Sequence, residues 1–235
     1  MKIEVITIGD ELLLGFVVDT NAAFLARALA GVGVEIVRRC TVPDDAAAIA
    51  GSVGEALDRT GAVITTGGLG PTSDDMTKPA IAALFGRELR IDEEIVALIE
   101  QRFRSFGFTG PMPPGNRQQA MIPQGAVVIP NAHGTAPGIW IEDERGRWVA
   151  MLPGVPREMR GMLADELLPS AALLGLVIAG VMAVAVPGCG TWLTPDIADC
   201  AGLDVFALVT ALTAVVTFAF SLWAVPHLVA TAEPV

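Results

Sequence analysis

The sequence predicts an α/β domain over residues 1–170, built on a mainly parallel sheet with helices on both faces, and an apolar helical tail over residues 171–235. The first observation behind this prediction is that short β-branched runs alternate with stretches of helical character, as in parallel sheets. The second is that glycine-rich and polar loops follow the strands. The third is a change of composition near residue 170: all 15 Lys and Arg precede it, together with 22 of the 26 acidic residues.

The first half of the domain is expected to contain three strands and two helices. Residues 2–8 read KIEVITI, a β-branched and apolar run that predicts a buried strand. A helix over 22–30 is expected to begin at a cap of Thr20 or Asn21 and to end at glycine. A strand over 34–37, a helix from 43 to about 58 and a strand over 62–66 follow.

The second half is expected to continue with three helices and three further strands. A glycine-rich loop leads into a helix that runs through Phe85, and another helix spans 93–106. Strands are predicted at 127–129, 139–141 and 148–152, and the last is followed by a Pro-Gly turn and a helix. Ligands of parallel sheets bind beyond the carboxyl ends of the strands. We therefore expect a site where the loops at 9–11, 67–75 and 153–158 come together.

Composition and charge exclude several classes of protein. The net charge of −11 argues against nucleic-acid binding, which requires clustered Lys and Arg. A hydrophobic content of 52% and a mean hydropathy of +0.56 exclude a disordered chain. Three cysteines are too few for a disulfide scaffold, and two histidines argue against an ordinary zinc centre. Cys40 has no His or Cys neighbour in sequence and is interpreted as a core or surface thiol.

The loop G-G-L-G-P-T-S-D-D at 67–75 carries the strongest chemical signal. Its glycines allow the backbone to approach a ligand closely, and the start of the following helix favours a phosphate or diphosphate. Asp74 and Asp75 have two available roles. They cap the helix, or they hold a divalent metal that bridges phosphate oxygens or orients an attacking water. The loop matches neither the Walker A pattern nor G-x-G-x-x-G.

Two further loops offer similar chemistry. The run N-A-H-G-T-A-P-G at 131–138 supplies an amide and a hydroxyl among small residues, and P-G-V-P-R-E-M at 153–159 ends a strand and opens a helix. Taken singly, each is interpreted as a turn. Arg157 and Glu158 are then expected to be solvated residues of a first helical turn.

Together these runs resemble the amino-terminal domain of the CinA (competence/damage-inducible protein A) family. The motifs, in order, are T-I-G-D-E-L-L-L-G with D-T-N at 19–21, T-G-G-L-G-P-T-S-D-D-M-T-K, P-N-A-H-G-T-A-P-G and L-P-G-V-P-R-E-M. The resemblance covers about residues 1–170 and implies the three-layer α/β/α sandwich of the MoaB/Mog molybdopterin-binding proteins. CinA proteins continue into a nicotinamide-nucleotide amidase domain. Residues 171–235 do not resemble that domain, so amide hydrolysis is not expected.

The resemblance also implies a function. It implies metal-dependent hydrolysis of a nucleotide diphosphate such as ADP-ribose in NAD recycling, with a divalent metal, Mg²⁺ or Co²⁺. The alternative is a module that binds molybdopterin or a pterin nucleotide without hydrolysis. In either case we expect a homo-oligomer that binds a small-molecule ligand and no nucleic acid.

The resemblance carries site residues over by motif. The phosphate and metal cradle would consist of Gly67, Gly68, Gly70, Thr72, Asp74 and Asp75. Asp74 and Asp75 would be the catalytic and metal-binding pair. Asp10 and Glu11 would face this cradle from the end of the first strand. The rest of the pocket would be formed by Asn131, Gly134, Thr135, Pro153 and Gly154.

Residues 171–235 contain no Lys or Arg and only four acidic residues, which is the composition of a membrane segment. The stretches 171–188 and 205–225 are candidate spans, since a bilayer span needs about 20 residues. Arg157 and Arg160 precede the first span, and positive residues favour the cytoplasmic side. The tail is therefore expected to anchor a cytoplasmic domain to the cytoplasmic membrane. The alternatives are two helices packed on the domain, or a fused or frameshifted end.

Overall fold

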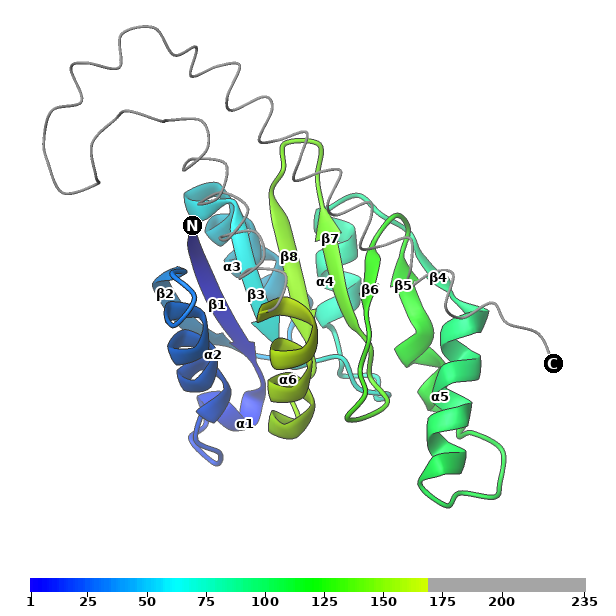
Figure 1. Ribbon diagram of the computed structural model, residues 1–235. Helices are drawn as coiled ribbons and strands as arrows, with labels where there is room; N and C mark the ends of the chain where they lie inside the picture. Colours follow the sequence, from blue (N-terminus) through cyan, green and yellow to red (C-terminus); the bar gives the residue numbers. More distant parts are fainter. Residues whose placement is uncertain (169–235) are drawn as a thin grey trace, which may run out of the picture. The chain divides into compact units, whose positions relative to one another are not determined.

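The computed structural model describes residues 1–168, in which strands and helices alternate along the chain (Figure 1). In chain order the elements are β1 (Lys2–Ile8), α1 (Asp10–Leu13), α2 (Thr20–Ala30), β2 (Glu35–Val42), α3 (Ala46–Thr60), β3 (Ala62–Thr66), α4 (Thr77–Leu84), β4 (Leu89–Ile91), α5 (Glu93–Ser105), η1 (Pro114–Ala120), β5 (Met121–Pro123), β6 (Val127–Ile129), β7 (Gly138–Glu142), β8 (Trp148–Leu152), α6 (Pro156–Met162) and η2 (Leu163–Leu167).

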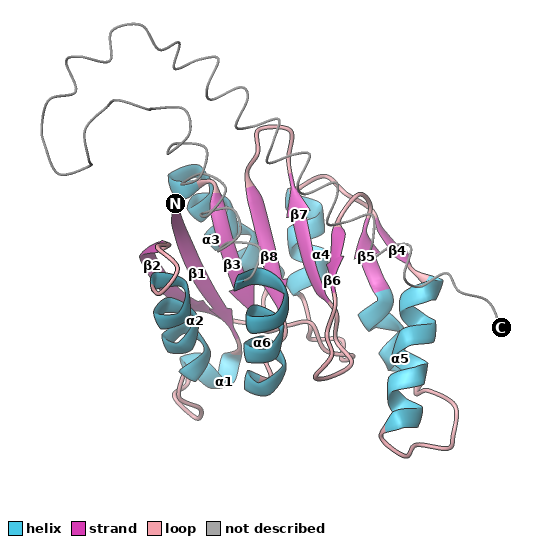
Figure 2. Cartoon of the chain, viewed as in Figure 1, coloured by secondary structure: helices cyan, strands magenta, loops and turns pink. Residues whose placement is uncertain are grey.

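The centre of the structure is a six-stranded sheet in the order β2-β1-β3-β8-β7-β6 (Figure 2). The strands β2, β1, β3 and β8 are parallel, whereas β7 and β6 extend the sheet in antiparallel fashion. A separate antiparallel pair joins β4 to β5. The predicted α/β class with a mainly parallel sheet is therefore confirmed.

Two hydrophobic cores lie on opposite faces of this sheet, because successive side chains of a strand point to opposite faces. Ile3 and Val5 of β1 belong to the core that also contains residues of α2 and α6. Ile6 and Ile8 of the same strand belong to the core formed with α3 and α4. Figure 1 shows the two pairs of helices covering the two faces. This arrangement forms three layers.

The sequence patterns placed two boundaries wrongly. The second strand, β2, extends to Val42 rather than ending near residue 37. It is an edge strand whose pairing with β1 continues past its apolar residues, so its polar end is held by the backbone ladder. Helix α2 is capped by Asp19 rather than by Thr20 or Asn21, since the Asp19 carboxylate accepts a hydrogen bond from the Ala22 amide at 2.9 Å.

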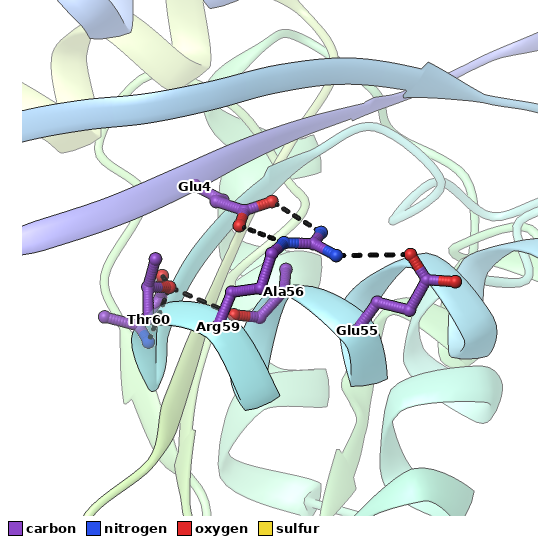
Figure 3. A network of polar contacts seen from close by, with 6 residues as sticks. Glu4, Glu55, Ala56, Arg59 and Thr60 are labelled. Carbon is purple, nitrogen blue, oxygen red and sulfur yellow. Dashed lines mark hydrogen bonds and ion pairs between the residues drawn. The ribbon is translucent and has the colours of Figure 1, made fainter.

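An ion pair between a buried carboxylate and a partly exposed guanidinium links β1 to α3 (Figure 3). Glu4 is only 1% exposed, and its carboxylate accepts two hydrogen bonds from the Arg59 guanidinium, at 2.7 and 2.9 Å. Arg59 also donates to Glu55 at 3.3 Å. The hydrogen bond to Glu4 is the main cause of a raised pKa for Arg59. These two hydrogen bonds offset the free-energy cost of burying the Glu4 carboxylate, which would otherwise have no partner for its charge.

The predicted membrane spans, 171–188 and 205–225, lie outside the described residues. Within residues 1–168 no helix is both long and apolar enough to cross a membrane. The longest helix of that part of the chain, α3, has 15 residues.

Candidate ligand-binding site

A cavity of about 660 Å³ lies beyond the carboxyl ends of β1, β3 and β8. The loops that follow these three strands line it, as expected for a parallel sheet. Of the site residues predicted from the sequence, those that line the cavity are Glu11, Gly67, Gly68, Gly70, Asp74, Asp75, Thr135, Pro153 and Gly154. The other four, Asp10, Thr72, Asn131 and Gly134, are not part of this lining but contact residues that belong to it.

The glycine-rich loop turns tightly between β3 and α4. Gly67 and Gly68 have φ angles of +114° and +63°, which L side chains rarely adopt. A Cβ on Gly67 would overlap the carbonyl oxygen of Ile8, and a Cβ on Gly68 would overlap the Thr77 hydroxyl. That hydroxyl donates to the Gly67 carbonyl at 2.9 Å. Only glycine fits at these two positions.

Asp75 braces this loop from inside. Its carboxylate accepts hydrogen bonds from the amides of Gly70 and Thr72, each at 2.8 Å, and from the Thr72 hydroxyl. Helix α4 begins two residues later, and no side chain caps it. Asp75 therefore caps the amides of the loop and not the first turn of helix α4. Asp74 is exposed, and a hydrogen bond with the Thr72 side chain lowers its pKa.

Acidic side chains dominate the charged lining of the cavity. They are Glu11, Asp19, Asp44, Asp74, Asp75 and Glu158, and the described residues contribute no Lys or Arg to the lining. Asp44 was not among the predicted site residues. Burial raises its pKa, and the carboxylates of Asp10, Glu11 and Asp75 raise it further. The Asp10 amide donates to the Asp44 carboxylate at 3.1 Å, which joins the loops after β1 and β2.

The described residues hold no complete protein-only metal site. Within residues 1–168 no group of three or more His, Cys, Asp or Glu is arranged to bind a metal ion. Mg²⁺ at phosphate sites commonly takes one or two carboxylates and completes its coordination with phosphate oxygens and water. Asp74 and Asp75 are adjacent in sequence and both line the cavity, but the Asp75 carboxylate already accepts hydrogen bonds from Gly70 and Thr72. The metal remains a prediction.

A second group of hydrogen bonds, around Asn21, joins the carboxyl ends of the three strands β1, β3 and β8 at the cavity. The Asn21 side-chain amide donates to the Gly154 carbonyl at 2.8 Å and to the Thr66 hydroxyl at 3.2 Å. Thr66 in turn donates to the Pro153 carbonyl at 2.8 Å. Asp19 accepts a hydrogen bond from the Thr7 hydroxyl at 3.0 Å. The D-T-N run at 19–21 was the only sequence signal for these residues.

Glu158 is not the solvated residue that the sequence predicted. It lies in the first turn of α6, is partly buried and lines the cavity. Asn131 donates a hydrogen bond to its carboxylate, and burial raises its pKa. A Cβ on Gly134 would overlap this carboxyl group, so the loop before β7 can cover Glu158 because residue 134 is glycine. The contact was invisible in the sequence because 27 residues separate its two partners.

Lys78 is a further residue that the sequence did not single out. It is 4% exposed in the first turn of α4, and its ammonium donates to the carbonyl oxygens of Gln118 and Gln119. Burial lowers the pKa of Lys78 to about 8. Because Gln119 lines the cavity, Lys78 holds η1, which forms part of the cavity wall, against the start of α4.

Comparison with known protein families gives a match to the family described as "Probable molybdopterin binding domain" over residues 4–172. This match covers more than half of the chain and includes every loop that lines the cavity. The chain therefore belongs to this family.

Within the family, the similarity is to CinA proteins, which confirms the predicted resemblance. The chain is 67% identical over 170 residues to a CinA-like protein of Gemmatimonas aurantiaca, covering 72% of this chain and 39% of that protein. It is 42% identical over 169 residues to a putative competence-damage inducible protein of Caldicellulosiruptor saccharolyticus, covering 72% and 40%. The chain thus spans about two fifths of the length of these curated relatives.

A solved structure with similar architecture is that of the protein CinA, of unknown function, from Thermoplasma acidophilum. The two chains are 39% identical with a TM-score of 0.63. The match covers 69% of this chain and 94% of that one. The fold described above is therefore that of a CinA domain.

Proposed function

We propose that this domain binds a nucleotide diphosphate such as ADP-ribose and hydrolyses its diphosphate bond with a divalent metal. The observation that supports the proposal is a cavity in which a glycine loop adjoins two carboxylates and basic side chains are absent from the described lining. Such a cavity repels a diphosphate unless a cation enters with it. The metal requirement follows from this charge balance.

The hydrogen bonds of the loop support the same conclusion. The Gly67 amide donates to the Leu152 carbonyl at 3.1 Å, and the amides of Gly70 and Thr72 donate to Asp75. These three amides already have partners, so fewer remain for phosphate oxygens than the sequence suggested. A cation held by Asp74 and Asp75 would supply the missing positive charge.

The proposed reaction adds water to one phosphorus atom and breaks the bridging P–O bond, so ADP-ribose would give AMP and ribose 5-phosphate. A bound divalent metal supplies charge neutralisation and a water of lowered pKa. Asp74 and Asp75 would hold it. Glu158, whose pKa is raised by burial, is a lining carboxylate that could exchange a proton during the reaction.

The alternative is binding of a pterin nucleotide without hydrolysis, as the description of the family suggests. One observation favours it: the hydrogen bonds accepted by Asp75 already give that residue a purely structural role in the loop. Calorimetry of the full chain with a pterin nucleotide and with ADP-ribose separates the two functions. Tighter pterin binding without product formation would reverse our preference.

The hydrolysis is tested with the full chain, ADP-ribose, and either Mg²⁺ or Co²⁺. We expect release of AMP that falls on the order of 100-fold in Asp74→Asn, because that change removes a metal-binding charge. Asp74 is exposed, so the variant should keep the melting temperature of the parent protein. Asp75→Ala is the contrasting variant and should lose both turnover and thermal stability, since it also removes the brace of the loop.

Two results would contradict the proposal. The first is the absence of turnover with either metal in the parent protein. The second is turnover in Asp74→Asn at the rate of the parent protein. A loss of activity in Asp75→Ala alone would show only that the loop needs its brace.

A further inference from the structure

An unusually apolar surface lies at the mouth of the cavity. Five large apolar side chains within six residues are solvent-exposed at the end of α1 and in the loop after it; they are Leu13, Leu14, Phe16, Val17 and Val18. Side chains of this kind are normally exposed singly, and a contiguous exposed group marks a contact surface. None of these five side chains belongs to the hydrophobic cores of the described domain.

Part of this surface belongs to the cavity itself. Leu12, Val17 and Val18 line the cavity, and so do Val155 and Pro156 at the start of α6. Helices α2 and α6 pack against each other, and the two apolar segments immediately precede or open them. Both segments therefore meet at the same rim. We name these five residues, Leu12, Val17, Val18, Val155 and Pro156, the apolar rim.

We propose that the apolar rim binds the flat heterocyclic ring of the ligand, whose diphosphate lies at the Gly67–Asp75 loop. This inference rests on the proposed function, which gives the ligand a ring and a diphosphate. Adenine and pterin share the relevant chemistry: both are flat, aromatic and uncharged over their faces. Branched aliphatic side chains pack well against such faces and exclude water from them.

The charge of the cavity argues for this division of the ligand. A phosphate or a sugar hydroxyl gains nothing from aliphatic side chains, because burial without a hydrogen bond is unfavourable for a polar group. The acidic part of the cavity can accept the diphosphate only with its cation. The apolar rim is then the surface left for the ring.

The test measures binding rather than turnover. The ligands are α,β-methylene-ADP, which has a ring and a diphosphate that is not cleaved at its bridge, and methylenediphosphonate, which has no ring. Calorimetry uses the full chain with Mg²⁺. Val18→Ser should raise the Kd of α,β-methylene-ADP about tenfold and leave that of methylenediphosphonate unchanged, since only the ring loses apolar contact.

The matched control is Phe16→Ser in the same loop. Val18 is 80% exposed and lines the cavity, whereas Phe16 is 79% exposed and is absent from the lining. Phe16→Ser should therefore leave both affinities unchanged. Repeating the titrations with 6-hydroxymethylpterin diphosphate shows which ring the apolar rim prefers.

Several results would overturn the inference. One such result is a parent protein that binds neither ringed ligand. A second is an equal Kd of α,β-methylene-ADP in Val18→Ser and in the parent protein. A third is an equal loss of affinity in Val18→Ser and Phe16→Ser. A change of oligomeric state in Val18→Ser by light scattering, with ring binding intact, would make the surface a protein interface. Ring binding that Val18→Ser weakens, in a protein that cleaves no ADP-ribose, would refute the proposed hydrolysis and leave the apolar rim standing.

Discussion

Gly67→Ala is expected to destabilise the domain by about 4 kcal/mol and to abolish ligand binding, the largest effect predicted for a single substitution. Two costs add at this position. The φ angle of +114° is unfavourable for any L side chain. The new Cβ would also overlap the Ile8 carbonyl oxygen, which is backbone and cannot rotate away. The glycine loop would have to leave the end of β1.

The matched control for this prediction is Gly33→Ala. Gly33 has a φ angle of +80°, and a Cβ there would meet nothing within 4 Å. Gly33→Ala should therefore lower the unfolding free energy only by the conformational cost of the positive φ angle, about 1 kcal/mol. Urea unfolding of the two variants and the parent protein measures the difference. Equal losses in the two variants would show that the overlap with Ile8 is relieved at no cost.

The second large effect concerns Lys78 and pH. Its pKa is about 8 in the folded protein and 10.5 in the unfolded chain, so the unfolded state binds more protons between these values. Stability from this group therefore rises with pH across that window, by about 3 kcal/mol in total. Below pH 8 the Lys78 amine is protonated in both the folded and the unfolded state, and the free-energy cost of burying its charge is fully present.

Lys78→Met should remove this rise. The measurement is urea unfolding of parent and variant at pH 7.5, 9 and 10.5, with the difference in unfolding free energy followed across the series. Burial raises the pKa of Cys40, and the thiol therefore lowers stability at alkaline pH, but it is present in both proteins and cancels in the difference. A difference that stays constant with pH would show that Lys78 titrates normally.

The sequence by itself determined the layered fold and the position of the cavity. Ile3 and Val5 of β1 face one core, and Ile6 and Ile8 face the other. Because successive side chains of a strand point to opposite faces, this division follows from the sequence once the strand is recognised. Parallel strands align their carboxyl ends at one edge. For that reason the loops at 9–11, 67–75 and 153–158 were correctly expected to come together, and nine of the thirteen residues carried over by family motif line the cavity.

Short and polar elements were the weak point of the sequence patterns. The helix α1, the strands β4 and β5 and the 3-10 helix η1 were not predicted, because none of them contains a run of β-branched residues or an apolar period of helical spacing. The polar end of β2 is a strand because β1 lies beside it, which is a fact about its neighbour rather than about its own residues.

Only the tertiary structure decided which polar side chains serve the site. Asn21, Asp44 and Lys78 have their roles because loops from distant parts of the chain meet them, and Glu158 is partly buried because a loop 27 residues earlier covers it. The same holds for Asp75, whose carboxylate turned inward to brace the glycine loop. Local sequence sets the backbone periodicity that defines strands and helices. Burial and hydrogen-bond partners depend on what packs above each residue, and that is settled only when the whole chain has folded.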